Sequence, residues 1–292
     1  MQILDGKLVA QSIKDRVKET LESYAKCKKR TPCLATILVG ENGASLSYVA
    51  SKHKTALSLG FKTKDFKLPE SVSEDEITAL VNSLNHDSEV DAILVQLPLP
   101  DGFNTKRIIN EISPDKDADG ITYTNIAKVA LGEDGIVPCT PKGILEILNF
   151  YKIPTEGKHA VIIGRSRIVG RPVSLLLNNT INNATVTCAN SHTKDLKKIT
   201  LDADILIAAV GKSEFIDSSY VKEGAVVIDV GINRIKDENA KKGYVIKGDV
   251  NFNDVAPKAS FITPVPGGVG PLTIACLMDN TLELYKHREN II

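Results

Sequence analysis

The 292-residue sequence predicts an α/β fold with two domains, each a mostly parallel sheet flanked by helices. Short apolar runs that suit buried strands alternate with longer stretches of helical periodicity. This alternation occurs twice along the chain, which is long enough for two domains. Between the two occurrences lies "EDGIVPCTPKG" at 133–143, which is rich in proline and glycine and marks the boundary region.

The first half opens with a helical pattern over 6–29, in which apolar residues recur every three or four positions. Two continuous apolar runs, "CLATILVG" and "DAILVQLPLP", predict strands that are buried on both faces. The elements expected in this half are strands at 33–40, 61–68 and 91–100 and helices at 6–29, 44–59 and 73–86.

The second half repeats the pattern with more strands, and a last helix from Leu272 to about His287 is expected to pack back on the first domain. We predict one domain formed by 1–140 together with the C-terminal helix 273–292, and a second formed by 141–272. The strands expected in the second domain are 159–164, 184–189, 203–211, 225–231 and 259–265.

Composition excludes several classes of function. Lys and Arg together number 36, as do Asp and Glu, so the overall charge favours neither nucleic acid nor an anionic membrane. The longest apolar runs fall short of the ~18 residues that cross a bilayer, and the N-terminus lacks the pattern of a signal peptide. The five cysteines are scattered without a CxxC pair, which favours reduced thiols and a cytoplasmic location. The five histidines are also dispersed, and we expect no metal site.

The clearest ligand signal is "HAVIIGRSRIVGRP" at 159–172, a strand that runs into a glycine turn and then a helix. Gly164 lets the chain turn sharply, and Gly170 lets the helix start come close to a ligand. N–H groups at a helix start favour a bound phosphate. The spacing differs from the G-x-G-x-x-G of a Rossmann-like dinucleotide site, so a plain strand-to-helix turn is an alternative.

The next strand favours NADP over NAD. A site for NAD usually has Asp or Glu at the end of that strand, where it binds the ribose hydroxyls. Here the strand ends in "CANSHT", without a carboxylate. Arg165, Ser166 and Ser191 would instead receive a 2′-phosphate, so we predict an NADP pocket. Two later strand ends, at 226–234 and 261–271, should border the nicotinamide, although "PVPGGVGP" also suits a rigid connector.

Four residues of the first half are candidates for catalysis. Tyr48 and Lys52 lie four positions apart in a helical stretch, so their side chains share one face, although a lysine on a helix is most often solvated. Gln96 lies in an apolar strand, where a buried amide needs a partner that a lysine can provide. Asp119 lies in the polar turn "SPDKDADG". The Y-x-x-x-K spacing also occurs in short-chain dehydrogenases, but there the glycine-rich turn comes first, whereas here it follows.

Seven motifs in their order, "ASLSYVASKHK", "VQLPLP", "PDKDADG", "PCTPKG", "GRSRIVGRP", "VIDVGIN" and "TPVPGGVGP", closely resemble one family. It is the bifunctional methylenetetrahydrofolate dehydrogenase/methenyltetrahydrofolate cyclohydrolase family, and the resemblance spans essentially the whole chain. It implies two reactions at one site in the cleft between the domains. Methylenetetrahydrofolate gives a hydride to NADP, and the methenyl product is hydrolysed to 10-formyltetrahydrofolate. The resemblance also implies a homodimer.

The resemblance implies a role for each matching residue. Lys52 is the key acid/base of the hydrolysis, Gln96 holds it, and Tyr48 positions the folate. Asp119 binds the pterin, whose amide and amino N–H groups form a donor edge that suits a carboxylate. The other residues that the resemblance assigns to folate are Leu97, Pro98, Pro266, Gly267 and Gly270. Those that it assigns to NADP are Gly164, Arg165, Ser166, Ser191, Ile232 and Thr273.

Two other interpretations are open at this point. A two-domain NADP dehydrogenase of the shikimate or amino-acid type would share the architecture without needing Gln96 beside Lys52. A nucleotide-binding regulator that has lost catalysis would share the glycine turn, although intact Tyr48, Lys52, Gln96 and Asp119 disfavour it.

Overall fold

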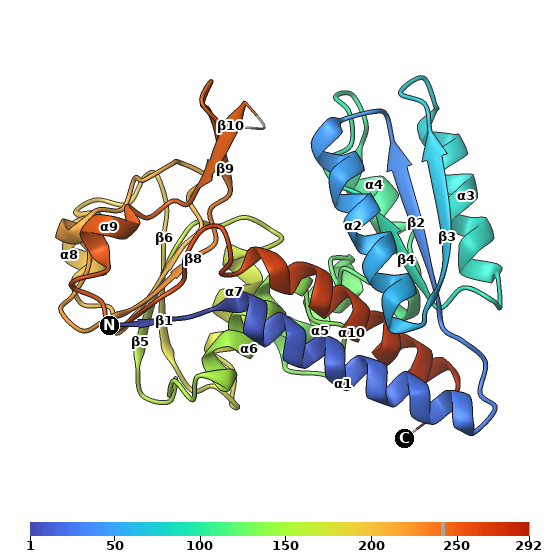
Figure 1. The fold of residues 1–292 in the computed structure, drawn as a ribbon, viewed down its shortest axis with the longest axis horizontal. Coiled ribbons are helices and arrows are strands. Elements are labelled where there is room, and N and C mark those ends of the chain that lie inside the picture. Colours follow the sequence, from blue (N-terminus) through green and yellow to red (C-terminus); the bar gives the residue numbers. More distant parts are fainter. Residues whose placement is uncertain (241–242, 292) are drawn as a thin grey trace. The chain divides into compact units, whose positions relative to one another are not determined.

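The computed structural model describes residues 1–240 and 243–291, and the chain divides into two compact units. The six-strand unit comprises Met1–Gln11, Val129–Glu133 and Pro138–Thr273, and the three-strand unit comprises Ser12–Lys128, Asp134–Val137 and Ile274–Ile292. Each unit contains a parallel sheet flanked by helices, which confirms the predicted α/β class (Figure 1). The predicted domain boundaries and the cleft between the domains stay predictions.

The three-strand unit is built on a parallel sheet in the order β3-β2-β4. Every residue of the central strand is buried, because α3 and α4 cover one face of the sheet and α2 packs on the other (Figure 1). The elements that lie wholly in this unit are β2 (Cys33–Val39), α2 (Gly43–Leu59), β3 (Lys62–Leu68), α3 (Glu74–His86), β4 (Ala92–Val95), α4 (Thr105–Asn110) and the 3₁₀ turn η1 (Pro114–Lys116).

The six-strand unit has a parallel sheet in the order β1-β11-β8-β7-β5-β6. Apolar residues of α8 and α9 pack on one face, and α7 contacts β5 and β6. Its elements are β1 (Gln2–Ile3), α6 (Cys139–Phe150), β5 (His159–Ile163), α7 (Gly170–Leu177), β6 (Thr185–Ala189), α8 (Leu196–Thr200), β7 (Ile205–Ala208), the 3₁₀ turn η2 (Ser218–Tyr220), β8 (Val226–Asp229), β9 (Asn233–Lys236), β10 (Tyr244–Lys247), α9 (Phe252–Val255) and β11 (Phe261–Ile262). Three helices have residues in both units: α1 (Gly6–Lys26), α5 (Tyr123–Leu131) and α10 (Gly270–Arg288).

Several elements differ from the sequence prediction. The boundary region 133–143 is not all loop, because α6 begins within it at Cys139. The predicted strand 91–100 ends at Val95, since the residues that follow form a turn with prolines. The antiparallel hairpin of β9 and β10 was not predicted. The short strand β1 was also not predicted, and it pairs with β11.

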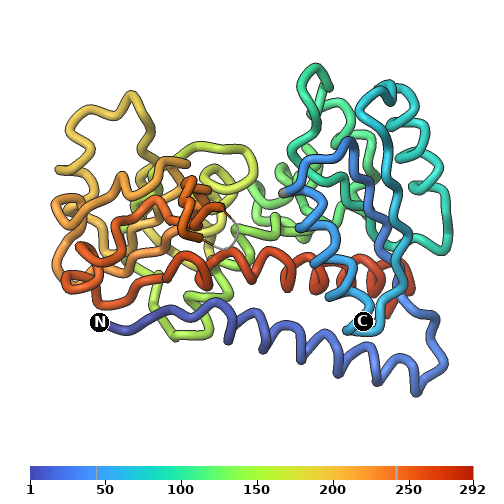
Figure 2. Tube along the Cα trace, turned by 45° about the horizontal axis from the view of Figure 1, so that its top comes forward, coloured from blue at the N-terminus to red at the C-terminus, as the bar shows by residue number. Residues whose placement is uncertain are grey.

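The last part of α10 belongs to the three-strand unit. Arg16 of α1 donates to Asp279 of α10 at 3.3 Å, and the two helices run side by side (Figure 2). Farther along α10, the Tyr285 hydroxyl donates to the backbone carbonyl of Arg30 at 2.8 Å. The C-terminal helix is therefore held by polar contacts as well as by its apolar face.

A buried carboxylate fixes the end of α10 to the sheet. Asp91 has no exposed surface, and its two oxygens accept hydrogen bonds from Arg30 at 2.8 and 2.5 Å. One oxygen also accepts from Arg288 of α10 at 2.9 Å, and the other from the Cys33 N–H at 2.9 Å. Two guanidinium groups thus neutralise one carboxylate that water does not reach.

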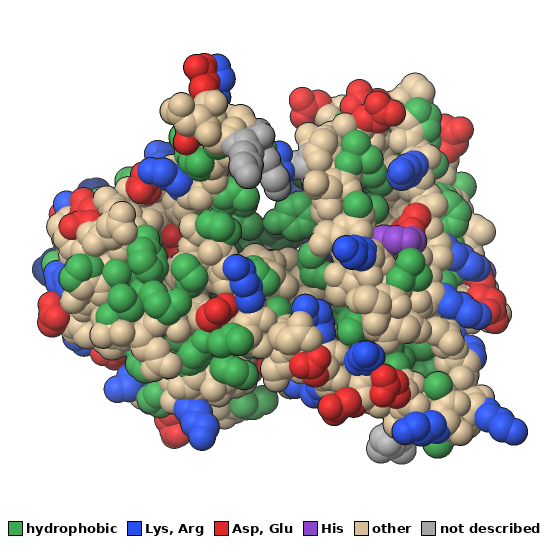
Figure 3. Space-filling view, in the orientation of Figure 1, with side chains coloured by type: hydrophobic (Ala, Val, Ile, Leu, Met, Phe, Trp, Pro, Cys, Tyr) green, Lys and Arg blue, Asp and Glu red, His purple; other side chains and the backbone are tan. Residues whose placement is uncertain are grey.

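The surface carries no dominant charge. Figure 3 shows basic and acidic side chains interspersed over the visible face, which agrees with the formal net charge of zero. Among the described residues, no helix has the length and apolar character needed to cross a membrane. Within the same residues no cysteine forms a disulfide, and three of the five cysteines are buried.

Replacing Asp91 by Ala should lower the free energy of unfolding by about 3–5 kcal/mol, because Arg30 and Arg288 would lose the carboxylate that compensates them. Asp75 is a matched control, since its side chain is 83% exposed and forms a surface ion pair with Arg107. Asp75→Ala should cost about 1 kcal/mol or less. Urea unfolding of both variants measures the difference, and equal costs would contradict a structural role for Asp91.

Candidate active site

Lys52 lies on the buried face of α2. Five residues of this helix, Ser45, Val49, Lys52, Ala56 and Leu59, follow one another at intervals of four and three, and each is 8% exposed or less. This spacing defines one face of a helix, and that face packs on the sheet. A lysine within such a stripe is not a solvated surface residue.

The Lys52 ammonium is held by Gln96, as the sequence predicts. Lys52 Nζ donates to Gln96 Oε1 at 2.9 Å, and both side chains are 8% exposed. The Gln96 Nε2 donates to the backbone carbonyl of Leu97 at 2.5 Å, so the amide oxygen has to face the lysine. The Gln96 N–H donates to Ile37 at 2.8 Å, which fixes Gln96 directly beyond the end of β4.

The second buried lysine of this unit has a different environment. Lys116 Nζ donates to the backbone carbonyls of Leu84 at 2.9 Å and Asp87 at 2.7 Å, at the end of α3. Burial lowers the pKa of Lys116 to about 8. Lys116 therefore caps a helix, whereas Gln96 is the one hydrogen-bond partner that the described residues give to the Lys52 ammonium.

Asp119 is positioned by its neighbour Asp117. Asp117 is buried, and its carboxylate accepts hydrogen bonds from the Gly120 N–H at 2.9 Å, the Thr122 N–H at 2.8 Å and the Asn125 side chain at 3.0 Å. Burial raises the pKa of Asp117. These bonds fix the turn on both sides of Asp119, whose own side chain is half-buried.

The turn that carries Asp119 lies along β4. Asp117 forms a parallel bridge with Ile93, and the Ala118 N–H donates to the Ile93 carbonyl at 3.3 Å. Because the two segments run in the same direction, Asp119 and Gln96 emerge at the same end of the pair. Tyr48 is half-buried one helical turn before Lys52, and the half-buried Leu97 and exposed Pro98 follow Gln96 in the next turn. The three-strand unit contains the six predicted site residues of the first half of the chain: Tyr48, Lys52, Gln96, Leu97, Pro98 and Asp119.

The two glycines of the predicted nucleotide turn are required by close packing. Gly164 has a φ of +131°, and a Cβ there would lie 2.2 Å from the carbonyl oxygen of Ala209. A Cβ on Gly170 would lie 2.2 Å from the carbonyl oxygen of Gly164 itself. The start of α7 therefore rests directly on the end of β5, which is the approach that the unusual spacing allows.

The ends of β5 and β6 bring the predicted NADP residues to one edge of the sheet. The two strands are parallel and in register, with Ile163 opposite Ala189, so the turns that follow them are neighbours. Arg165, Ser166 and Ser191 lie in these turns, and all three are exposed. The Ser166 hydroxyl accepts weak hydrogen bonds from backbone N–H groups at the start of α7, at 3.2 and 3.3 Å. The edge offers a cation and hydroxyls in a turn without a carboxylate.

The remaining predicted residues also lie in the six-strand unit. Gly267 has a φ of +111° and accepts from the Gly6 N–H at 2.9 Å, and Pro266 before it is exposed. A Cβ on Gly270 would lie 3.8 Å from the side chain of Ile232, so these two residues are neighbours. The Thr273 hydroxyl donates to the Gly270 carbonyl at 2.8 Å. Pro266, Gly267 and Gly270, which the resemblance assigns to folate, thus share a unit with the nucleotide residues.

Sequence analysis missed three buried aspartates that hold functional loops: Asp117, Asp229 and Asp249. In the structure the last two each lie within two residues of a glycine whose Cβ would collide with the other carboxylate, a relation that the sequence alone does not show. Among the described residues, no group of three or more His, Cys, Asp and Glu could hold a metal ion.

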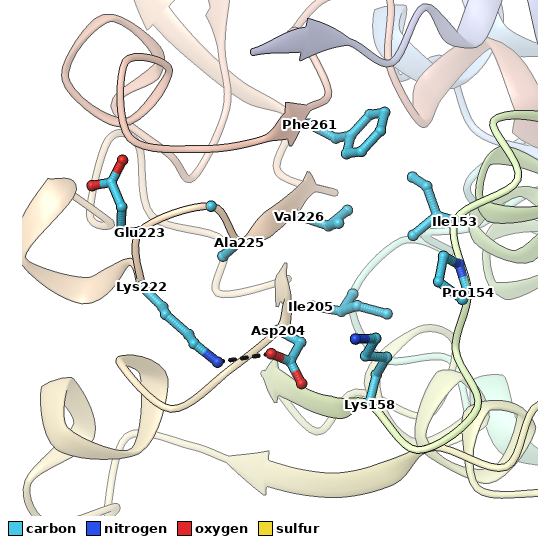
Figure 4. A pocket seen from close by; sticks show the side chains of 11 residues that line it. Ile153, Pro154, Lys158, Asp204, Ile205, Lys222, Glu223, Ala225, Val226 and Phe261 are labelled. Atoms are coloured by element: carbon cyan, nitrogen blue, oxygen red, sulfur yellow. Dashed lines mark hydrogen bonds and ion pairs between the residues drawn. The ribbon is translucent and has the colours of Figure 1, made fainter.

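A pocket at the opposite edge of the six-strand sheet contains none of the predicted site residues. It lies at the amino ends of β5, β7, β8 and β11, and Figure 4 shows Asp204 and Lys222 paired at its side. Its lining residues are Ile153, Pro154, Lys158, Asp204, Ile205, Lys222, Glu223, Gly224, Ala225, Val226 and Phe261. Ligands of open α/β sheets usually bind at the carboxyl ends of the strands, which are at the other edge.

Comparison with known proteins identifies matches to both halves of the chain. The family model for the catalytic domain of tetrahydrofolate dehydrogenase/cyclohydrolase matches residues 4–119. The model for the NAD(P)-binding domain of tetrahydrofolate dehydrogenase/cyclohydrolase matches residues 138–289.

Full-length relatives agree with these models. The bifunctional protein FolD of Flavobacterium johnsoniae is 50% identical over 290 residues, which cover 99% of this chain and 98% of that relative. The solved structure of the bifunctional enzyme FolD, methylenetetrahydrofolate dehydrogenase/cyclohydrolase, of Campylobacter jejuni has a TM-score of 0.93 at 46% identity and covers 99% of both chains. The FolD of Trypanosoma brucei, complexed with NADP cofactor and an inhibitor, has a TM-score of 0.94 at 35% identity over 98% of both chains. A shikimate 5-dehydrogenase of Thermus thermophilus, with a TM-score of 0.51 at 14% identity, shares the fold alone.

Proposed function

Because the chain belongs to the tetrahydrofolate dehydrogenase/cyclohydrolase family, we propose that it carries out both of the reactions in that family name. It oxidises 5,10-methylenetetrahydrofolate to 5,10-methenyltetrahydrofolate with NADP and then hydrolyses the product to 10-formyltetrahydrofolate. The single observation that carries this proposal beyond family membership is the buried hydrogen bond between Lys52 and Gln96. It supplies the oriented amine that the hydrolysis needs.

Lys52 acts as the acid/base of the hydrolysis. Water adds to the cationic methenyl carbon and loses a proton, and the bond from this carbon to one ring nitrogen of the folate breaks as that nitrogen receives a proton. Lys52 accepts the proton as a neutral amine and returns it as an ammonium, and Gln96 fixes the direction of the Lys52 nitrogen through a neutral oxygen rather than a carboxylate. Gln96 is the residue that positions Lys52, and Tyr48, one turn away on α2, positions the folate.

The other residues of the proposed site bind the folate, including its pterin ring. The Asp119 carboxylate accepts hydrogen bonds from the amide and amino groups of the pterin edge, a geometry that two carboxylate oxygens suit. Asp117 fixes the turn that presents it. Leu97 and Pro98 line the folate site on this unit, and Pro266, Gly267 and Gly270 supply contacts from the other.

The carboxyl edge of the six-strand sheet fits NADP. Gly164 and Gly170 bring the start of α7 close to the turn, and Arg165, Ser166 and Ser191 receive the 2′-phosphate. Residues 164–169 and 190–193 include no carboxylate that would repel it. Ile232 and Thr273 are the further cofactor contacts. When bound, NADP supplies the hydride acceptor, and the protein contributes orientation.

Replacing Lys52 by Met should abolish cyclohydrolase activity while part of the dehydrogenase activity survives, because only the hydrolysis uses the amine. Methionine suits the buried stripe of α2, so the variant should fold. Lys54→Met is the matched control on the exposed side of the same helix and should keep both activities. Loss of methenyltetrahydrofolate absorbance measures the hydrolysis. A wild-type rate in Lys52→Met would remove Lys52 from the mechanism.

Replacing Arg165 by Ala should raise the KM for NADP by about tenfold or more and change the KM for NAD little, because NAD lacks the 2′-phosphate that the guanidinium pairs with. Steady-state dehydrogenase assays with each cofactor measure the two values. Equal losses with NADP and NAD would show that Arg165 does not distinguish the cofactors.

The paired assay also separates the other interpretations. A dehydrogenase of the shikimate or amino-acid type would oxidise its own substrate and leave methenyltetrahydrofolate intact. A regulator without catalysis would turn over neither folate. The similarity to shikimate 5-dehydrogenase is confined to the fold, so no observation favours that substrate.

We also propose that the protein is a homodimer in the cytoplasm. The family resemblance implies the dimer, and the sheet of the six-strand unit offers one route, because β6 is its terminal strand. A terminal strand presents backbone groups that can pair with another chain.

Sedimentation equilibrium should give twice the 31.6 kDa mass of one chain at micromolar concentration. A single-chain mass across the concentration range used in the activity assays would contradict the homodimer, while leaving the assignment of both activities intact.

A further inference from the structure

Two buried carboxylates lie at the carboxyl edge of the six-strand sheet, and the mechanism above uses neither. Asp229 is the last residue of β8 and is 3% exposed. Asp249 follows β10 by two residues and has no exposed surface. Buried carboxylates are costly unless donors surround them, so their partners indicate what they do.

Asp249 binds two loops that are far apart in the sequence. One oxygen accepts from the backbone N–H groups of Val210 at 2.6 Å and Gly211 at 2.8 Å. Both residues lie in the loop that follows β7. The other oxygen accepts from the Asn233 side chain at 2.9 Å, at the start of β9. Asp249 therefore ties the loop after β7 to the loop after β8.

Asp229 completes the same network. One of its oxygens accepts from the backbone N–H groups of Gly231 and Asp249, each at 2.9 Å. The other accepts from the Val250 N–H at 2.9 Å, and the Asp229 N–H donates to the Thr263 hydroxyl at 2.7 Å. Burial raises the pKa of Asp229 to about 6, against the effect of these donors.

Two glycines without side chains leave space for these carboxylates. A Cβ on Gly231 would lie 2.3 Å from an oxygen of Asp249, and a Cβ on Gly248 would lie 1.8 Å from an oxygen of Asp229. Asp249 thus fills the space beside Gly231, which is two residues from Asp229 in the sequence. Asp229 fills the space beside Gly248, which directly precedes Asp249. No larger residue at either glycine leaves room for the network.

The two aspartates hold the residues on both sides of Ile232. Ile232 is 48% exposed, although it stands between Gly231, whose N–H is held by Asp229, and Asn233, whose side chain is held by Asp249. The loop is thus fixed on both sides of Ile232, which the family resemblance assigns to the cofactor.

We propose that Asp249, with Asp229 beneath it, is a positioning residue for the cofactor: it fixes the loops at 210–211 and 231–233 and so sets the affinity for NADP. This inference rests on the proposed function, which places NADP at this edge of the sheet. Asp249 itself touches no reacting atom. Its effect is carried by the backbone of the two loops and by Ile232.

Asp249→Asn tests the proposal with little change of shape. The amide has one acceptor oxygen, so it cannot accept from both the Val210 and Gly211 N–H groups and the Asn233 side chain. We expect the KM for NADP to rise about tenfold, with kcat for the dehydrogenase within about twofold of wild type. Cyclohydrolase activity should be unchanged, because that reaction depends on Lys52 in the other unit.

Asp204→Asn is the matched control. Asp204 also accepts from a backbone N–H, that of His159 at 3.0 Å, and from Lys222 at 2.7 Å, but it lies at the amino edge of the same sheet (Figure 4). Its KM for NADP should equal the wild-type value. A rise of the same size in both variants would show that any carboxylate bound to the backbone of this sheet matters equally, and would overturn the proposal.

A second variant keeps the test decisive if Asp249→Asn fails to fold. Asn233→Ala removes one donor to Asp249 and leaves the backbone donors in place. It should raise the KM for NADP by a few-fold with kcat and cyclohydrolase activity unchanged. A wild-type KM for NADP in every one of these two variants that folds, including Asn233→Ala alone, would refute the proposal. A wild-type enzyme without NADP-dependent oxidation of methylenetetrahydrofolate would instead refute the proposed function.

Discussion

A buried ammonium held by a neutral amide is the interaction on which the proposed chemistry depends. Removing a charge from water is costly, and proteins usually compensate a buried lysine with a carboxylate. Lys52 has the oxygen of Gln96 instead, and the amide nitrogen of Gln96 is engaged with Leu97. The partner fixes the direction of the ammonium without neutralising its charge. We therefore propose Lys52 for the proton transfer, whereas Lys116 binds the carbonyl groups at the end of a helix.

Buried aspartates have a different role: they accept hydrogen bonds from the backbone N–H groups of loops. Chain segments that follow a strand lose the sheet as a hydrogen-bond partner, so their N–H groups need other acceptors. Asp117 provides these in the turn of Asp119, and Asp229 and Asp249 provide them in the loops after β7 and β8. In each place an exposed or half-buried residue that binds a ligand is predicted next to a fully buried carboxylate. Buried acceptors therefore fix the backbone beside each of the residues proposed to bind a ligand.

Sequence analysis succeeded where the signal was periodic or local. The strand predicted at 33–40 is β2, Cys33–Val39, because a continuous apolar run of strand length leaves little choice. The contact between Lys52 and Gln96 was predicted because an amide in an apolar strand needs a partner, and a lysine one helix away could reach it.

The analysis failed where the determinant was short or distant. The helix α4, Thr105–Asn110, is too short to show a period, and the side chains of the hairpin of β9 and β10 are exposed or half-buried without strict alternation. Asp249 could not be predicted as an anchor, because its donors Val210 and Gly211 are almost forty positions earlier in the chain. Contacts of that range depend on the order of strands in the sheet, which the local pattern does not contain.

The hydrogen bonds around Lys52 and Asp119 share no residue with those around Asp249. The hydrogen bonds that orient Lys52 and fix the turn of Asp119 join residues of the three-strand unit, and those around Asp249 join residues of the six-strand unit. Residues without shared partners contribute nearly additively to free energy. Under the proposed function, substitutions near Arg165 that alter the preference for a cofactor should therefore leave the hydrogen bond of the buried lysine unchanged. The groups proposed to bind the dinucleotide and the group proposed to move the proton then depend on different hydrogen bonds of the same chain.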